Sequence, residues 1–519
     1  MSDLLSRRRF LTRGTLAGTA AVTLPSFLGA CGGAPQRTAM TPTAAAPPAY
    51  FSVYGIDAAR VRGTLSELTS RGADQAELYF QSSRSTSILY QDGIVSRASG
   101  TVDLGVGLRC VVGEQTGYAY TEELTPEAMR RAARTAAAIA HGSDAVPPVE
   151  LRHRDLGANR YALDVPWRDV GIEQKLPIIQ RCAAMARAMD PSIVKVDVSW
   201  ADSDSRVLIA DMQGRMSFDE RPMARLTVSI VAERDGERQS NRANLSGRRG
   251  LELFDEEGLA RVTRQAVERT LVLFDARRPP AGEMPVVLDA GASGILLHEA
   301  IGHGMEADFN RKDISIYAEM LNEQVAEPFV TIVDDGTLDN ERGALNVDDE
   351  GQPVGRTTLV ENGRLVSYMH DGISSRHYGV NATGSGRRQS FRHAPMPRMR
   401  CTYMEAGPHT RDEIIAAVPR GILAQTFTNG QVEIGAGDYT FYIKNGWLIE
   451  DGRLTAPIKD VNIIGNGPET LRRISMVADD AVLDTGGWNC GKQGQSVPVS
   501  LGIPTVLVSQ MTVGGENAD

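Results

Sequence analysis

The sequence has few cysteines and no cluster of basic residues. It contains five cysteines in 519 residues, and their spacing does not suggest a disulfide framework. Lysine and arginine are scattered along the chain, whose net charge is −10. This pattern argues against a surface that holds a phosphate backbone, so we expect no nucleic-acid partner.

An apolar run near the N-terminus is too short to cross a membrane. It extends from Gly14 to Ala30, whereas a spanning helix needs about 20 residues. Arg7 and Arg8 precede the run, and Cys31 ends the sequence Leu-Gly-Ala-Cys, which resembles a lipobox. We therefore predict that 1–31 is a twin-arginine signal, and that the protein is periplasmic and anchored through a lipid on Cys31. The alternative is a disordered basic N-terminus with an incidental cysteine.

Large apolar residues are also scarce after the predicted signal. Residues 32–53 are rich in Pro, Ala and Thr, which indicates a tether. Apolar spacing then predicts a mixed helix and strand domain over 54–275. Its helices are expected at 56–72, 125–141, 172–188 and 254–274, and its strands at 76–80, 87–90, 94–97, 103–112, 194–199, 207–210 and 224–232.

A Pro-rich stretch at 275–282 marks the predicted boundary to a second domain, 284–519. Short apolar runs separated by Gly and Asn turns follow, among them 286–288, 357–361 and 365–369, with helices expected at 410–417 and 468–474. The predicted fold class is α+β with two domains. The C-terminal one is a mainly antiparallel sheet or partly open barrel that carries the metal site described next.

The sharpest motif is a pair of histidines, His298 and His303, with Glu299 after the first. It has one residue more than the H-E-x-x-H pattern of zinc peptidases. On a regular helix the two histidines would lie about 140° apart, too far round to share an ion. Gly302 and Gly304 would allow a left-handed residue or a π-bulge that brings His303 back toward His298. Glu299 would then be free to act as a general base on a zinc-bound water.

A catalytic zinc site needs a third protein ligand. Cys490 is the predicted donor, because it lies in a Gly-rich turn where Lys492 could favour the ionised sulfur. Glu306 and Asp308 are rival ligands, and the two histidines could instead be ordinary hydrogen-bonded residues at a helix end. Whether Cys110, Cys182 and Cys401 form a disulfide is left open.

Four segments resemble the TldD/PmbA family of metallopeptidases: HEAIGHGMEADFNRK, NATGSGRRQSFRHAPMPRMRCTY, IIGNGPETLRRI and CGKQGQSVPVSLGIPT. The resemblance implies a catalytic TldD-type subunit with Zn2+ held by His298, His303 and Cys490, and with Glu299 as the catalytic residue. It also implies peptides or unfolded segments as substrates, and a dimer either with a PmbA/TldE-like subunit or with a second copy of the chain. The export signal departs from the usual family pattern.

The second of these segments concentrates arginines. Arg387, Arg388 and Arg398 could bind carbonyl or carboxylate groups of a substrate, or could make ordinary salt bridges in a solvated loop. The expected strands at 435–441 and 442–448 could offer an edge for an extended peptide. The alternative function is a non-catalytic peptide-binding or scaffolding subunit whose metal is structural or absent.

Overall fold

The computed structural model describes residues 47–140, 142 and 144–515. The predicted export signal, with Arg7, Arg8 and Cys31, and nearly all of the predicted tether lie outside these residues. No helix within the described ranges combines the length and the apolar character needed to cross a membrane.

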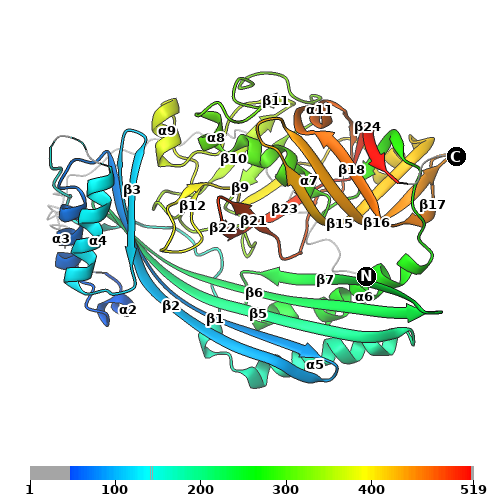
Figure 1. The fold of residues 1–519 in the computed structure, drawn as a ribbon, viewed down its shortest axis with the longest axis horizontal. Helices are drawn as coiled ribbons and strands as arrows, with labels where there is room; N and C mark the ends of the chain where they lie inside the picture. The colour runs from blue at the N-terminus through cyan, green and yellow to red at the C-terminus, as the bar shows by residue number, and fades with distance from the viewer. Residues whose placement is uncertain (1–46, 141, 143, 516–519) are drawn as a thin grey trace, which may run out of the picture. The chain divides into compact units, whose positions relative to one another are not determined.

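A long, mostly antiparallel sheet forms the first part of the described chain. Its strand order is β3-β2-β1-β5-β6, and both β7 and the short β4 pair with β6. The strands bend along their length (Figure 1). Their bounds are β1 (Gln75–Gln91), β2 (Ile94–Val112), β3 (Gln115–Thr121), β4 (Arg152–His153), β5 (Ile193–Asp211), β6 (Arg215–Arg234) and β7 (Glu237–Gly247).

These strands are longer than the sequence predicted. The expected strands 76–80 and 87–90 are parts of β1, and in the same way β2 and β5 each join two expected strands. The joining segment of β1 is rich in Ser and Thr, so it lacks the apolar alternation that marks a strand. Cross-strand hydroxyl pairs hold it instead: Ser85 with Thr101 at 2.6 Å and Ser87 with Ser99 at 2.8 Å.

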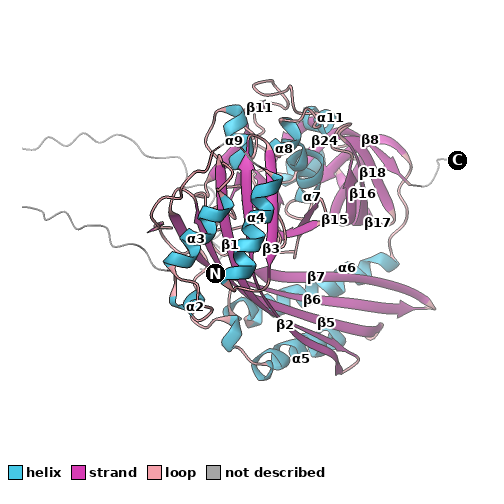
Figure 2. Cartoon of the chain, turned by 60° about the vertical axis from the view of Figure 1, so that its left-hand side comes forward, coloured by secondary structure: helices cyan, strands magenta, loops and turns pink. Residues whose placement is uncertain are grey.

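Two pairs of helices cover the sheet (Figure 2). Helices α3 and α4 pack on side chains such as Leu78 and Phe80, whereas α5 and α6 pack on a second cluster that includes Trp200 and Leu226. Because successive side chains of a strand alternate between faces, Tyr79 lies on the other face and packs with residues of the C-terminal part. The helices are α2 (Ala49–Ser52), α3 (Ala58–Leu68), α4 (Pro126–Ile139), α5 (Ile172–Met189) and α6 (Glu256–Leu271).

The C-terminal part contains a closed ring of five strands. Strands β15, β8, β24, β18 and β16 pair in that order, and the pairing of β16 with β15 closes the ring. Strand β16 thus has partners on both sides, so the peptide-binding edge expected at 435–448 is wrong. The bounds are β8 (Gly282–Leu288), β15 (Arg420–Val432), β16 (Asp438–Glu450), β17 (Arg453–Ile458), β18 (Val461–Asn466), β19 (Ile474–Val477) and β24 (Val506–Gly514).

A six-stranded sheet of order β11-β10-β9-β14-β23-β20 and two short hairpins, β12-β13 and β21-β22, complete the strands. The strand expected at 365–369 ends at Leu365, because the chain then turns away and buries Tyr368, whose hydroxyl donates to the carbonyl of Tyr317. The strand bounds are β9 (Ile332–Asp335), β10 (Arg356–Glu361), β11 (Arg364–Leu365), β12 (Gly386–Arg387), β13 (Met396–Pro397), β14 (Cys401–Met404), β20 (Val482–Leu483), β21 (Asn489–Lys492), β22 (Gln495–Pro498) and β23 (Ser500–Ile503).

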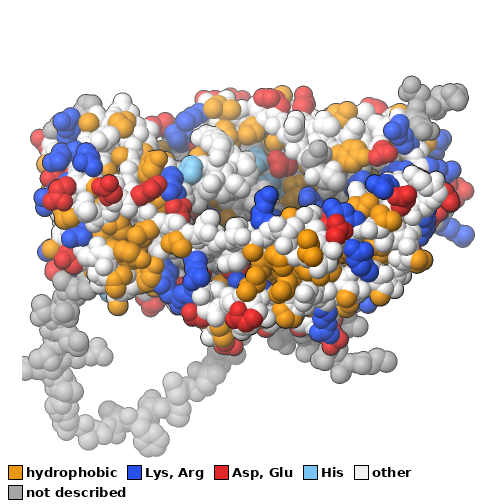
Figure 3. Space-filling model, turned by 60° about the horizontal axis from the view of Figure 1, so that its bottom comes forward, with side chains coloured by type: hydrophobic (Ala, Val, Ile, Leu, Met, Phe, Trp, Pro, Cys, Tyr) orange, Lys and Arg blue, Asp and Glu red, His pale blue; other side chains and the backbone are white. Residues whose placement is uncertain are grey.

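The remaining helices are short, and the described chain as a whole is a mixed α/β fold. Their bounds are α7 (Gly294–Leu297), α8 (Ala307–Asn310), α9 (Gly372–Tyr378), α10 (Arg411–Ala416) and α11 (Gly467–Arg472). On the face drawn in Figure 3, basic and acidic side chains are interspersed around a central hollow, without a large patch of Lys and Arg alone.

Candidate metal centre

The histidine motif lies on a helix that changes its winding. Helix α7 continues into a π-helical segment, His298–Gly302, and then into one 3-10 turn, His303–Met305. The backbone N–H of His303 donates to the carbonyl of His298, five residues earlier. The wider turn absorbs the extra residue of the motif, and the two imidazole rings lie 5.1 Å apart between centroids. The predicted π-bulge is therefore confirmed.

Gly302 and Gly304 serve packing, and the left-handed conformation considered for them is absent. Gly302 has a φ of −59°, and Gly304 is not among the residues of positive φ. A Cβ on Gly302 would meet Sδ of Met399 at 2.2 Å, and a Cβ on Gly304 would meet the ring of Tyr317 at 2.5 Å. At both positions a larger residue would push against a buried side chain.

Cys490 reaches the histidines from the β21-β22 hairpin. Its Sγ lies 3.5 Å from Nε2 of His303. One ligand atom from each of His298, His303 and Cys490 lies within 4.8 Å of the others, and all three side chains are buried. Within the ranges that the structure describes, this is the group of His, Cys and acidic residues with the geometry to hold a metal ion.

The unsatisfied polar atoms of this group fit a metal. Neither ring nitrogen of His298 has a hydrogen-bond partner among the described residues, although the side chain is buried. A buried polar atom without a partner costs roughly 1–3 kcal/mol. Two imidazoles and a thiolate are donors that zinc prefers, and three protein ligands are typical of catalytic zinc sites.

The two histidines, rather than Lys492, favour the ionised sulfur of Cys490. Burial disfavours the thiolate, but the nearby imidazoles of His303 and His298 outweigh burial and hold the pKa of Cys490 well below its usual value. Lys492 instead pairs with Asp308 at 2.6 Å and with Glu306 at 3.0 Å. The role predicted for Lys492 is therefore wrong, because the neighbouring carboxylates attract its ammonium group.

Glu306 binds the outer nitrogen of His303. Its Oε2 lies 2.9 Å from Nδ1 of His303, while Lys492 neutralises the same carboxylate. Burial disfavours the Glu306 carboxylate, but Lys492 and His303 outweigh it and lower its pKa to about 2. The ring of His303 thus presents Nε2 toward Cys490. Glu306 and Asp308 lie outside the group of candidate ligands and act as partners of a histidine and a lysine.

Glu299 lies beside the group and reaches solvent. Its Oε2 is 3.8 Å from Nε2 of His303, and 23% of its side chain is exposed. A carboxylate in this position is close enough to accept a proton from a water molecule that approaches the donors, which is the geometry that a general base needs.

The three arginines selected from the sequence are buried and bonded to protein groups. Arg387 donates to the carbonyls of Met399 and Pro498. Arg388 pairs with Glu77 at 2.9 Å, and Arg398 donates to the carbonyl of Cys490 at 2.6 Å. These contacts support the walls of the site and the hairpin that carries the cysteine.

Sequence reasoning missed Arg342, which fixes the segment that precedes Cys490. Its guanidinium donates to the carbonyl of Trp488 and to Oδ1 of Asn489, the latter at 2.7 Å. No local pattern marks this residue, because 146 and 147 residues separate it from its partners.

Three family models together match most of the described chain. They are the PmbA/TldA metallopeptidase domain 1 at residues 76–140, the central domain at 165–274 and the C-terminal domain at 281–515. The Pro-rich stretch at 275–282 lies where the second match gives way to the third.

Curated proteins and solved structures show the same similarity. A protein of Haemophilus influenzae named Metalloprotease TldD homolog is 42% identical over 457 residues, covering 87% of this chain and 95% of that protein. A Zinc metalloprotease TldD homolog of Saccharolobus solfataricus is 27% identical and covers 80% of this chain and 90% of its own length. The crystal structure of TldE from Thermococcus kodakarensis shares the fold, with a TM-score of 0.67 at 20% identity over 85% of this chain and 97% of that one.

Proposed function

Since the chain belongs to the TldD/PmbA family of metallopeptidases, we propose that it is a zinc-dependent peptidase that cleaves peptides or unfolded protein segments. The observation that carries the proposal is the convergence of His298, His303 and Cys490, whose ligand atoms lie within 4.8 Å of one another. These three residues would hold the ion, and the name of the Saccharolobus relative points to zinc.

The bound ion would supply a Lewis acid that polarises the scissile carbonyl and favours ionisation of water. Glu299 would accept a proton from the attacking water at its carboxylate, which is 3.8 Å from Nε2 of His303. It would later return the proton to the leaving amine. Glu306 would hold His303 in the tautomer whose Nε2 is free for the ion.

The proposal extends to the organisation of the chain. We propose a mixed α/β domain at 54–275 and a C-terminal domain at 284–519 that carries the metal group, in line with the family boundary between 274 and 281. We also propose a dimer, with a TldE-like subunit or a second copy, because the fold is shared with TldE.

The proposal for the cellular location rests on sequence. Arg7 and Arg8 would direct export by the twin-arginine route, and a lipid on Cys31 would anchor the mature protein in the periplasm. Labelled palmitate incorporation tests this step: wild type is expected to take up the lipid and Cys31→Ser to lose it.

Replacement of Glu299 by Gln tests the peptidase. The variant should bind as much zinc as wild type and fail to cleave an unstructured peptide, because Gln keeps the shape of the side chain but cannot accept the proton. Equal cleavage by the variant and wild type would refute the role of Glu299. Tight peptide binding without cleavage by zinc-loaded wild type would instead favour the non-catalytic scaffolding alternative.

A further inference from the structure

A polar cavity of about 310 Å³ lies against the segment that leads to Cys490. Its lining comes from β5, β6, β7, α6, β15 and β16, from Ala292, and from the segment 484–488. Four basic residues contribute to the lining: Arg225 of β6, Arg242 of β7, Arg269 of α6 and Lys444 of β16. Its volume is at the lower end of the range for ligand pockets, about 300–1,000 Å³.

Strand alternation directs polar side chains of β6 into this cavity. Leu226, Val228 and Ile230 point into the apolar core beneath α5 and α6. The intervening Arg225, Thr227 and Ser229 line the cavity. The inner face of the sheet is thus polar at this point, unlike the inner face near Tyr79, which packs on the C-terminal part.

One acidic side chain balances only part of the basic lining: Asp484 attracts the guanidinium of Arg269. Among the described residues, none of Arg225, Arg242, Arg269 and Lys444 forms an ion pair. Asp484 is the single acidic side chain in the described lining, and its Oδ2 accepts from the indole of Trp488 at 2.5 Å. Burial and the nearby Arg242 lower the pKa of Arg225. The cavity therefore holds unbalanced positive charge inside a chain whose net charge is −10.

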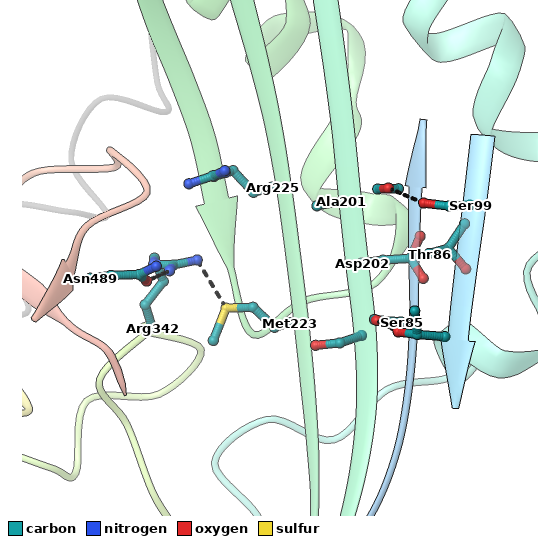
Figure 4. Close-up of a pocket in the computed structure, with 12 residues that line it drawn as sticks. Ser85, Thr86, Ser99, Ala201, Asp202, Met223, Arg225, Arg342 and Asn489 are labelled. Atoms are coloured by element: carbon teal, nitrogen blue, oxygen red, sulfur yellow. Dashed lines mark hydrogen bonds between the residues drawn. The ribbon is translucent and has the colours of Figure 1, made fainter. Parts of the chain in front are cut away.

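The basic lining continues on the other side of Arg225. A second cavity, of about 330 Å³, shares Arg225 and is also lined by Arg342, Asn489 and hydroxyl side chains of β1 and β2. Its one acidic residue, Asp202, is paired with Lys175 at 2.6 Å. Figure 4 shows Arg225 extending from β6 toward the segment that carries Asn489, with Arg342 on the same side as Asn489. Trp488 and Asn489, which border the two cavities, directly precede Cys490.

We propose that the cavity lined by Arg225, Arg242, Arg269 and Lys444 is a subsite for a carboxylate of the peptide substrate, either an acidic side chain or a free C-terminus. This inference rests on the proposed peptidase function and names a substrate class for it. Guanidinium groups match carboxylates in charge and in planar geometry. A bound carboxylate would relieve the mutual repulsion of the basic side chains, which Asp484 alone compensates only in part.

Binding to the inactive Glu299→Gln protein, loaded with zinc, tests the subsite without requiring turnover. The probes are short, unstructured, labelled peptides in which one Glu is moved along a neutral sequence, each matched by a Gln peptide. A second arm compares a free C-terminal carboxylate with the amide, so the two sources of the carboxylate are distinguished. We expect at least one acidic peptide to bind about tenfold more tightly than its neutral counterpart. This is the gain in affinity that one charge-assisted hydrogen bond provides.

Arg269→Gln and Arg242→Gln should remove this preference and leave binding of the neutral peptides unchanged. Arg131→Gln is the control, because Arg131 is an exposed residue of α4 outside the cavity and carries the same charge. Arg242 is exposed at the cavity rim, so its variant is expected to fold even if Arg269→Gln does not. Equal binding of acidic and neutral probes, or a preference that survives both substitutions, would overturn the subsite.

The two proposals fail in different ways. Wild type that cleaves peptides without any charge preference would leave the peptidase standing and refute the subsite. If acidic peptides bind more tightly than neutral ones but zinc-loaded wild type does not cleave them, the carboxylate subsite stands as a binding site and the peptidase function is refuted.

Discussion

Nδ1 of His303 lies 2.9 Å from Oε2 of Glu306, and Nε2 of the same ring lies 3.5 Å from Sγ of Cys490. One imidazole therefore bridges a buried carboxylate and a buried sulfur. The carboxylate fixes the outer nitrogen, and this leaves the inner nitrogen to face His298 and Cys490. The contact explains why a glutamate three residues after the second histidine is buried.

Glu306→Gln should weaken zinc binding by about 10- to 100-fold, the usual effect of losing an acceptor behind a metal-binding histidine. Gln can bond to Nδ1 only weakly and leaves Lys492 without part of its counter-charge. Competition with a chromophoric chelator measures the affinity. Asp308→Asn is the matched control, because Asp308 pairs with the same lysine but not with His303. If both variants lose zinc affinity equally, the loss is due to the changed environment of Lys492 and not to the contact with His303.

Gly302→Ala should displace the π-helical segment, because the new Cβ would lie 2.2 Å from Sδ of Met399. Overpacking of this kind costs about 1–3 kcal/mol. Zinc content and the denaturation midpoint should both fall. The second substitution Met399→Ala makes room for the methyl group and should restore part of both values. A double variant no better than Gly302→Ala would show that Met399 is not the obstacle.

His370 should make stability depend on pH. Burial lowers its pKa from 6.5 to about 4, and its ring packs against Tyr378. Between these two pH values the unfolded chain binds a proton that the folded chain does not, so the free energy of unfolding falls as the pH is lowered. The full contribution is about 3 kcal/mol.

Urea denaturation at pH 7 and pH 5 tests this effect by comparing wild type with His370→Phe, which keeps a ring but cannot titrate. Wild type should lose more stability than the variant over this interval. The metal ligands titrate in both proteins, so their effect cancels in the difference. An identical loss in the two proteins would rule out His370 as a source of acid sensitivity.

Glu350→Gln should destabilise the protein by about 1–3 kcal/mol, because it removes one of the two buried carboxylates that pair with Arg109, the other being Glu77 at 2.7 Å. Glu350 lies 2.5 Å from Nη2 of Arg109, and both side chains are fully buried. The exposed pair of Arg356 and Glu405 provides the control, since Glu405→Gln should cost less than about 1 kcal/mol. Chemical denaturation measures both. If Glu350→Gln and Glu405→Gln lower the free energy of unfolding by similarly small amounts, the pair of Arg109 and Glu350 is not important for stability.

Local patterns predicted the helices and the π-distortion well. Helix α5 occupies 172–189 where apolar spacing predicted 172–188. The five-residue spacing of His298 and His303 indicated that the helix was not regular, and the structure has a π-helical segment there. Both predictions depend on residues within one or two turns of each other.

Long-range relationships were beyond local reasoning. Cys490 and His303 are 187 residues apart. Sequence spacing therefore left Cys490 as one of several possible third ligands, and the family resemblance supported its choice. The contacts of Arg398 could not be foreseen either, because a buried arginine and a substrate-binding arginine look alike in a sequence. The alternation of Arg225, Thr227 and Ser229 with apolar residues was a usable signal for the cavity, since it marks a strand with one polar face.

X-ray absorption at the zinc edge tests the central claim most directly, because it counts the sulfur and nitrogen ligands of the ion itself. The account predicts one sulfur at about 2.3 Å and imidazole nitrogens at about 2.0 Å in zinc-loaded wild type. It also predicts that Cys490→Ser loses the sulfur signal. A zinc-loaded wild type without a sulfur ligand, or an unchanged sulfur signal in Cys490→Ser, would contradict it.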